Sequence, residues 1–116
     1  MQFTKEELDA LLSQPKPLQL AGLDLSKANL HGVDLSKADL SRANLHGATL
    51  IEADLTDSDL RSADLSGADL NRANLSFANL TGANLKGANL NGVVYNTHTQ
   101  WPAGLDLTEA GTTLVP

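Results

Sequence analysis

A leucine recurs at every fifth residue through most of this chain, and that period constrains the fold more than any other feature. The series starts at Leu20 and runs to Leu90, and Tyr95 takes the next place. Two positions before the leucine lies Leu18, Leu23 or Val33 in early units and alanine in most others, and Asp or Asn usually lies directly before the leucine. Sixteen five-residue units of this kind fit between Leu18 and Thr97.

Neither a helix nor a flat strand can place leucines of this period on one side. In a helix, each step of five residues turns the leucine by about 140° around the axis. In a strand, an odd step puts successive leucines on opposite faces. The chain must therefore bend once per unit, so that four units close a square coil. Stacked coils then bury the apolar surface that a single coil would leave exposed. The expected inward residues are Leu20, Leu25, Leu30, Leu35, Leu40, Leu45, Leu50, Leu55, Leu60, Leu65, Leu70, Leu75, Leu80, Leu85, Leu90 and Tyr95.

The units at 38–42 (ADLSR) and 83–87 (ANLKG) resemble the A(D/N)LXX consensus of the pentapeptide-repeat family. This resemblance implies an all-β solenoid, a right-handed quadrilateral β-helix of about four coils. At the usual spacing between strands, four coils stack to about 19 Å. The chain then divides into a capping helix and linker at 1–17, the repeat at 18–97, and a C-terminal cap and tail at 98–116.

The segment before the repeat has the features of a short helix that covers the first coil. Thr4 and Glu7 have the spacing of a capping box, and Pro15 and Pro17 end the helix. The apolar stripe of this helix consists of Leu8, Leu11 and Leu12. A membrane anchor needs a basic polar face, whereas acids outnumber bases here, so we expect a lid.

The segment after the repeat contains the single tryptophan of the chain, Trp101. With Tyr95, the pair Trp101-Pro102 and the later Ala110-Gly111, this tail resembles a closing segment of cyanobacterial pentapeptide-repeat proteins. A large aromatic residue at an open apolar end is normally core, so we expect Trp101 to cover the last coil. The alternative is a surface for self-association.

Composition excludes several classes of protein. The formal net charge of −6 disfavours a protein that neutralises phosphates, so no nucleic acid is expected as a partner. Cysteine is absent, which leaves no disulfide framework and no thiolate metal site. No apolar run is long enough to cross a bilayer, and the acids near the N-terminus are unlike a signal peptide. We therefore expect a cytoplasmic protein with no membrane association.

The sequence contains no recognisable catalytic pattern, so we expect neither an enzyme nor a cofactor. The three histidines, His31, His46 and His98, fall on different sides of the square or beyond the repeat, which argues against a shared metal site. The serines occupy variable outward places, and no nucleophile elbow or phosphate-binding loop is present. The regular aspartates are better explained as acceptors of backbone hydrogen bonds at turns.

Stacking places residue n over residue n+20, so Asp34 lies over Asp54 and Asp39 over Asp59. Summed by side, formal charge reaches −2 on the side centred on Leu55, against zero or −1 on the others. An exposed apolar residue bordered by charge is typical of a contact surface, although it also occurs on ordinary solvated surface. The candidate interaction surface is Asp34, Lys37, Asp54, Asp57 and Phe77, with Ile51 just before it in the chain.

These features favour a non-catalytic interaction or scaffold module that presents a rigid surface to an unknown protein partner, as a monomer or weak homodimer. The resemblance to cyanobacterial members implies a regulatory role as one interpretation. The alternative is a DNA mimic that acts on gyrase, as in the quinolone-resistance branch of the family. This chain departs from that branch because it is short, the formal charge of its repeat is only −3, and leucine occupies the central position of each unit. Loss of gyrase supercoiling in its presence would favour the mimic.

Overall fold

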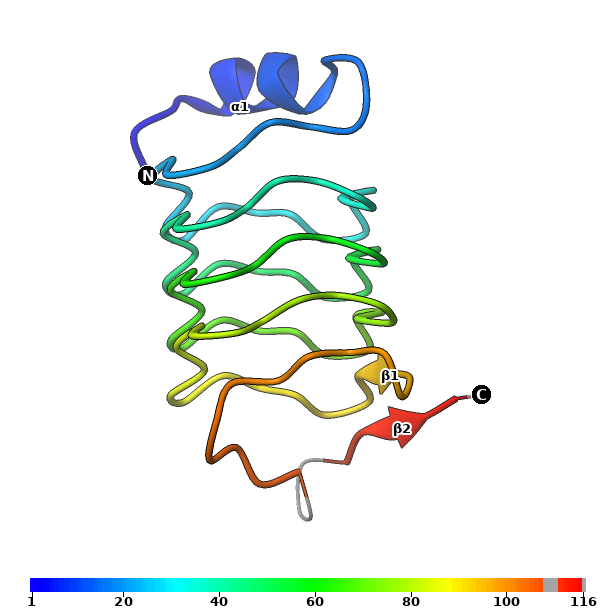
Figure 1. Cartoon of the computed structure of the whole chain (residues 1–116). Coiled ribbons are helices and arrows are strands. Elements are labelled where there is room, and N and C mark those ends of the chain that lie inside the picture. Colours follow the sequence, from blue (N-terminus) through cyan, green and yellow to red (C-terminus); the bar gives the residue numbers. More distant parts are fainter. Residues whose placement is uncertain (108–110, 116) are drawn as a thin grey trace.

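The computed structural model of the chain shows a stack of square coils with a helix at one end and a short paired tail at the other (Figure 1). It describes residues 1–107 and 111–115. The helix α1 spans Lys5–Leu12, and the strands β1 and β2 span Val94–Tyr95 and Thr113–Leu114. The molecule measures 39 × 25 × 21 Å, and its long direction is the axis of the stack.

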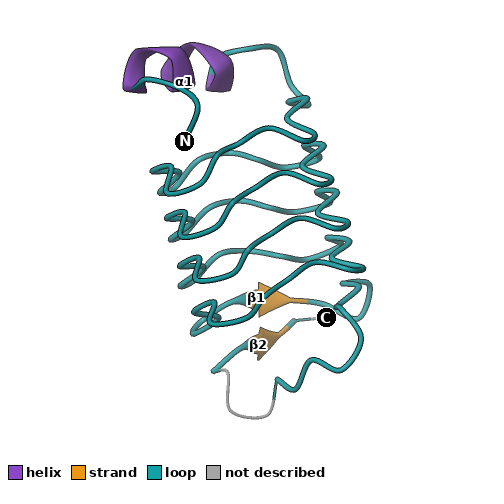
Figure 2. Cartoon of the chain, turned by 90° about the vertical axis from the view of Figure 1, so that its left-hand side faces the viewer, coloured by secondary structure: helices purple, strands orange, loops and turns teal. Residues whose placement is uncertain are grey.

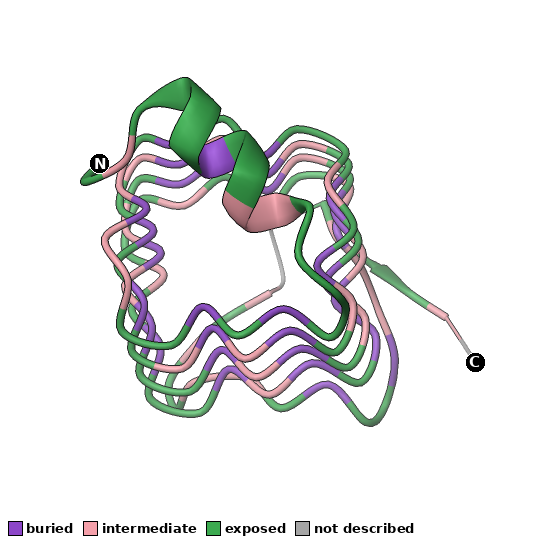
Figure 3. Ribbon diagram, turned by 90° about the horizontal axis from the view of Figure 1, so that it is seen from above, coloured by how far each residue is buried: buried purple, intermediate pink, exposed green. Residues whose placement is uncertain are grey.

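Residues twenty positions apart pair with each other, which confirms the predicted stacking. The residue before each central leucine forms a single parallel bridge to its equivalent in the next coil, as Asp34 does with Asp54. Two backbone bonds flank this bridge: the Leu35 N–H donates to the Asp54 carbonyl at 2.8 Å, and the Asp54 N–H donates to the Val33 carbonyl at 3.0 Å. Viewed along the axis, the superposed coils outline a square (Figure 3).

The square has four faces, which are numbered in chain order. Face 1 is centred on Leu20, Leu40, Leu60 and Leu80; face 2 on Leu25, Leu45, Leu65 and Leu85; face 3 on Leu30, Leu50, Leu70 and Leu90; face 4 on Leu35, Leu55, Leu75 and Tyr95.

Each corner is built by the residue types that recur there. The Asp or Asn before the leucine accepts a bond from the backbone N–H two residues on, as Asp34 does from Ser36 at 3.0 Å. From Gly22 to Gly92, the last residue of each unit has a φ between 58° and 74°. The following N–H closes a turn, as Ala38 does with the Leu35 carbonyl at 3.1 Å. Of the standard turns, type II has positive φ at the third residue alone. The aspartates therefore serve the corners, as predicted.

The axis of the stack is filled with leucine and alanine. The central leucines from Leu20 to Leu80 are at most 1% exposed and Leu90 is 8% exposed, whereas Leu85 and Tyr95, near the C-terminal end, are partly buried. Ser58 replaces the usual alanine and is 1% exposed. Its hydroxyl has no hydrogen-bond partner among the residues that the structure describes.

The helix α1 lies across the open end of the first coil (Figures 2 and 3). The predicted capping box is present, because the Glu7 N–H donates to Thr4 Oγ1 at 3.1 Å and the Thr4 N–H donates to Glu7 Oε1 at 2.9 Å. Leu8 is buried, and Leu11 and Leu12 pack against the core with partial exposure. The helix thus shields the first coil from water.

At the opposite end the stacking register changes by one residue. Asn79 pairs with Gln100, 21 residues away, so coil pairing continues past residue 97, where the sequence repeat ends. The Asn96 side chain accepts bonds from the N–H groups of Phe77 and His98, both at 3.1 Å. Thr99 is buried, and its hydroxyl donates to the Leu75 carbonyl at 2.9 Å. These bonds hold the extra residue in place.

After this shift the tail covers part of the last coil. Trp101 follows Gln100 as Leu80 follows Asn79, and its ring meets the Tyr95 ring edge-on with centroids 5.4 Å apart. Trp101 is partly buried against the core. The strands β1 and β2 pair in parallel, and the Gly111 carbonyl accepts the Gly92 N–H at 2.9 Å. Ala110 of the predicted Ala110-Gly111 pair lies outside the described residues.

Candidate functional site

The structure places five of the six candidate surface residues on face 4, in two columns. Asp34 and Asp54 form one column and bridge each other. Lys37, Asp57 and Phe77 form the other column, at the corner where face 4 ends, and all five side chains belong to exposed residues. The backbone connects the corner residues, because the Asp57 N–H donates to the Ser76 carbonyl, next to Phe77, at 2.9 Å.

Ile51 does not belong to this group. It follows Leu50 on face 3 and is only partly exposed, and its carbonyl accepts the Gly32 N–H at 2.8 Å. Stacking by twenty puts it in a column with residues 31, 71 and 91, whereas Phe77 lies in the column of residues 37 and 57. Ile51 therefore flanks face 4 at the corner where the face begins.

Phe77 is the most unusual side chain on this face. It is 48% exposed, and its backbone has a φ of +62°, a region that bulky residues rarely adopt. Its ring stacks on the imidazole of His98, with centroids 5.0 Å apart and planes 8° from parallel. Exposure and left-handed backbone both carry a free-energy cost, so Phe77 is the residue on this face that most needs a functional explanation.

His98 completes this aromatic pair and was not predicted as part of the surface. It lies 21 positions after Phe77, so a search at the repeat spacing of 20 passes over it. The one-residue shift in register, which the Asn96 hydrogen bonds stabilise, places His98 next to Phe77 along the axis of the stack. The signal in the sequence was the loss of the repeat after Tyr95, which indicated a change of register but not its size.

The C-terminal half of face 4 is more apolar than its N-terminal half. Val94 stands where other units carry Asp or Asn, and Leu114, which pairs with Tyr95, is 57% exposed. The acids Asp34, Asp54 and Asp57 lie on the coils nearer α1. Face 4 therefore combines an acidic region with an apolar and aromatic region, the composition expected of a protein contact surface.

Hydrogen bonds at the corners keep part of this acidity ionised. The Ser36 hydroxyl donates to Asp34 Oδ1 at 2.6 Å, and this bond, together with the Ser36 N–H, holds the pKa of Asp34 below its ordinary value. The Asp54 carboxylate accepts the Thr56 N–H at 3.0 Å. The Asp34 carboxylate is thus available as a charge at neutral pH.

A serine, a histidine and an aspartate meet on face 2, a grouping that was not predicted from the sequence. Ser66 Oγ donates to Asp64 Oδ1 at 2.5 Å and lies 2.9 Å from His46 Nδ1. Because its single proton goes to Asp64, the hydroxyl accepts from the imidazole. A hydrolytic triad has the reverse order, with the histidine taking the serine proton and the carboxylate orienting the histidine. The Ser66 bonds also lower the pKa of Asp64, which makes it a weak base.

The other histidine of the repeat takes part in an exposed ionic cluster on face 3. His31 Nε2 and Arg72 Nη2 each lie 3.5 Å from Glu52 Oε1. Within residues 1–107 and 111–115, no group of three His, Cys, Asp or Glu side chains could hold a metal ion. The single helix in that part of the chain has eight residues and is neither long nor apolar enough to cross a bilayer.

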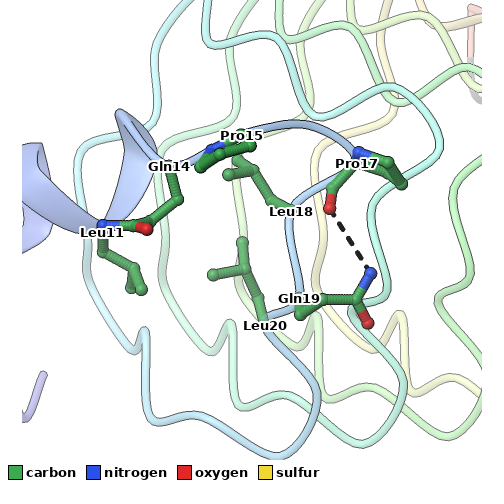
Figure 4. Close-up of a pocket in the computed structure, with 7 residues that line it drawn as sticks. All are labelled: Leu11, Gln14, Pro15, Pro17, Leu18, Gln19 and Leu20. Atoms are coloured by element: carbon green, nitrogen blue, oxygen red, sulfur yellow. Dashed lines mark hydrogen bonds between the residues drawn. The ribbon is translucent and has the colours of Figure 1, made fainter.

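A small hollow lies between α1, the linker after it and the first coil (Figure 4). Its volume is about 240 Å³, and it is lined by Leu11, Gln14, Pro15, Pro17, Leu18, Gln19 and Leu20. The lining is mostly apolar and holds no charged or nucleophilic side chain. This hollow is a packing imperfection under the lid rather than a reaction site.

Comparison with known proteins agrees with this architecture. Residues 19–57 and 58–94 match the family model described as "Pentapeptide repeats (8 copies)". A pentapeptide repeat protein from the thylakoid lumen of Arabidopsis thaliana is 39% identical over 81% of this chain, with a TM-score of 0.70. This chain spans 60% of the length of that protein. Comparison with curated proteins gives no match.

Two cyanobacterial structures are also similar. A pentapeptide repeat protein from Nostoc PCC 7120 is 38% identical, with 97% of this chain and 96% of that chain covered and a TM-score of 0.58. Another from Cyanothece 51142 is 38% identical, with 77% and 67% covered and a TM-score of 0.54. The fold is thus a right-handed quadrilateral β-helix, as predicted. From the repeat, the coil geometry and these matches together, the chain belongs to the pentapeptide repeat family.

Proposed function

We propose that this protein is a non-catalytic interaction module that presents face 4 to a protein partner. The observation that carries this proposal is Phe77, which is exposed, held in the left-handed region and stacked on His98. A rigid aromatic side chain can supply binding free energy when a partner desolvates it. The carboxylates on the same face supply steering during encounter.

The rest of the molecule supports a binding role rather than catalysis. The grouping of Ser66 with His46 and Asp64 has the wrong order of hydrogen bonds for a nucleophile. The hollow under α1 offers no polar group that could do chemistry. The stacked coils form a stiff rod, so a partner would meet face 4 in a fixed geometry.

The test is capture of partners from the source cell by the wild-type protein and by two variants. Phe77→Ala removes the aromatic anchor, and Arg42→Ala is the matched control, because Arg42 is also an exposed corner residue with a φ of 58° but lies on face 1. Circular dichroism first establishes that both variants fold. We expect a partner that the wild type and Arg42→Ala retain and Phe77→Ala loses.

Binding kinetics then separate the two parts of face 4. Phe77→Ala is expected to speed dissociation and leave association unchanged, because the ring acts after contact. Asp54→Lys is expected to slow association, most strongly at low salt, because steering by charge is screened by ions. If both folded variants bind the partner with wild-type kinetics, face 4 is ordinary solvated surface.

A further inference from the structure

The corner column of face 4 places a carboxylate directly before an aromatic ring along the axis of the stack. Asp57 and Phe77 hold equivalent positions in successive coils, which lie about 4.8 Å apart at the spacing of bridged strands. Both backbones are left-handed, with a φ of 62° each, so the side chains leave the corner in similar directions. Both residues are exposed.

Among the residues that the structure describes, His98 alone stacks on the Phe77 ring, and Phe77 is 48% exposed, so one face of the ring is open. His98 covers the other face in a nearly parallel stack, and it lies on the C-terminal side of Phe77. The free face is therefore turned toward the coil that carries Asp57. An aromatic face bears partial negative charge, so Asp57 and Phe77 present two electron-rich groups to the same space.

No cation of the described residues is paired with Asp57. The ion pairs in that part of the chain involve Glu52 and Asp59, on faces 3 and 1. Lys37 lies one coil before Asp57 in the same column, on the side away from the Phe77 ring. The space between Asp57 and the ring thus lacks the positive charge that would complement it.

We propose that this space receives an arginine side chain of the protein partner. A guanidinium group is planar, so it can lie on the Phe77 ring while its N–H groups donate to the Asp57 carboxylate. A lysine ammonium is compact and strongly hydrated, and it fits the two contacts less well. Asp34 and Asp54 on the same face add the long-range attraction that brings a basic partner to it. This inference rests on the proposed function and names the chemistry of the partner.

The experiment is an NMR titration of the isotopically labelled full chain with N-acetyl-arginine amide at physiological salt. N-acetyl-citrulline amide has almost the same shape without the charge and is the matched control probe. We expect the arginine probe to shift the amide resonances of Asp57, Phe77 and His98, and the ring to move the probe's δ-methylene protons upfield. Binding of the citrulline probe should be about two- to fivefold weaker, the ratio expected from a cation–π contact at an exposed site.

Two variants test the assignment of the contacts. Phe77→Leu keeps an apolar side chain at the corner but removes the ring, so the upfield shift of the probe should disappear. Asp57→Asn keeps the shape of the carboxylate but removes its charge, so the affinity for the arginine probe should fall while that for the citrulline probe stays the same. The dispersion of the amide spectrum shows whether each variant is folded.

The proposal is overturned if the citrulline probe binds as well as arginine, if shifts spread evenly over all exposed acids, or if no saturable shift occurs. These outcomes differ from failure of the proposed function. A partner whose capture depends on Phe77 while the arginine probe does not bind would retain face 4 as the interaction surface and exclude arginine as its ligand.

Discussion

Replacement of Ser58 by alanine should stabilise the protein. The Ser58 side chain points into the stack at 1% exposure, and its hydroxyl lacks a hydrogen-bond partner among the described residues. A buried polar group without a partner costs about 1–3 kcal/mol. Removing the oxygen leaves a gap smaller than a methyl group, so we expect a net gain of about 1 kcal/mol in the free energy of unfolding. At a typical urea dependence, this raises the unfolding midpoint by about 0.5 M.

The reciprocal change provides the control within the same column. Ala38 and Ala78 lie one coil before and one coil after Ser58, and both are 0% exposed. Ala38→Ser should therefore lower the free energy of unfolding by a similar amount, and the double variant Ser58→Ala with Ala38→Ser should resemble the wild type. The assay is urea unfolding followed by far-UV circular dichroism for the coils and by Trp101 fluorescence for the C-terminal end. Coincident transitions justify a two-state treatment.

Two results would refute this reasoning. Destabilisation by Ser58→Ala would mean that the hydroxyl makes a favourable interaction inside the stack. A neutral effect of Ala38→Ser would mean that the alanine positions tolerate a hydroxyl, so that burial without a partner carries no cost there.

Three further predictions concern the core, a corner and the effect of pH. Leu55→Ala should lower the free energy of unfolding by about 2–5 kcal/mol in urea titrations, because Leu55 is 0% exposed and the cavity cannot collapse in a stacked coil. A loss of stability no larger than that caused by an outward substitution would contradict the five-residue register. Gly92→Ala should be destabilising by thermal unfolding, because φ is +74° and the new Cβ would lie 2.9 Å from Arg72 Cγ. The folded-state pKa values of Asp34 and Asp64 lie below their ordinary 3.8. The stability that these two groups contribute is therefore present above that pH and is lost as the pH falls through the lowered values. An unfolding temperature that stays constant from pH 5 to acid would exclude this contribution.

The coils were predictable because every unit carries the same information. A leucine at each fifth place, with a small residue two positions earlier, is compatible with one bend per unit and with little else. Stacking by twenty residues then follows, and with it the pairing of Asp34 with Asp54 and the corner role of the aspartates. The cap at the N-terminus was readable too, because Thr4 and Glu7 form their hydrogen bonds locally.

The C-terminal end was not predictable to the same degree, because single side-chain hydrogen bonds determine it. Asn96 replaces a backbone carbonyl as the acceptor for Phe77, and Thr99 reaches back to the Leu75 carbonyl. The five-residue period does not indicate where a side chain will take the place of a backbone carbonyl. The stacked ring of His98 depends on it, so half of the aromatic pair was missing from the predicted surface. Ser66 and His46 are twenty residues apart, so their contact could have been expected, but not its hydrogen-bond order.

The shared register of the coils couples the length of this rod to the direction in which its ends face. Insertion or deletion of twenty residues within the repeat would change the distance between α1 and the Phe77–His98 pair and leave their relative orientation unchanged. Insertion of five residues would instead turn the C-terminal end by a quarter of a revolution about the axis, because each unit forms one face of the square. Gain or loss of single units in evolution can therefore change the relative orientation of the two ends. A protein engineer can use the same steps to orient two binding sites on one rod.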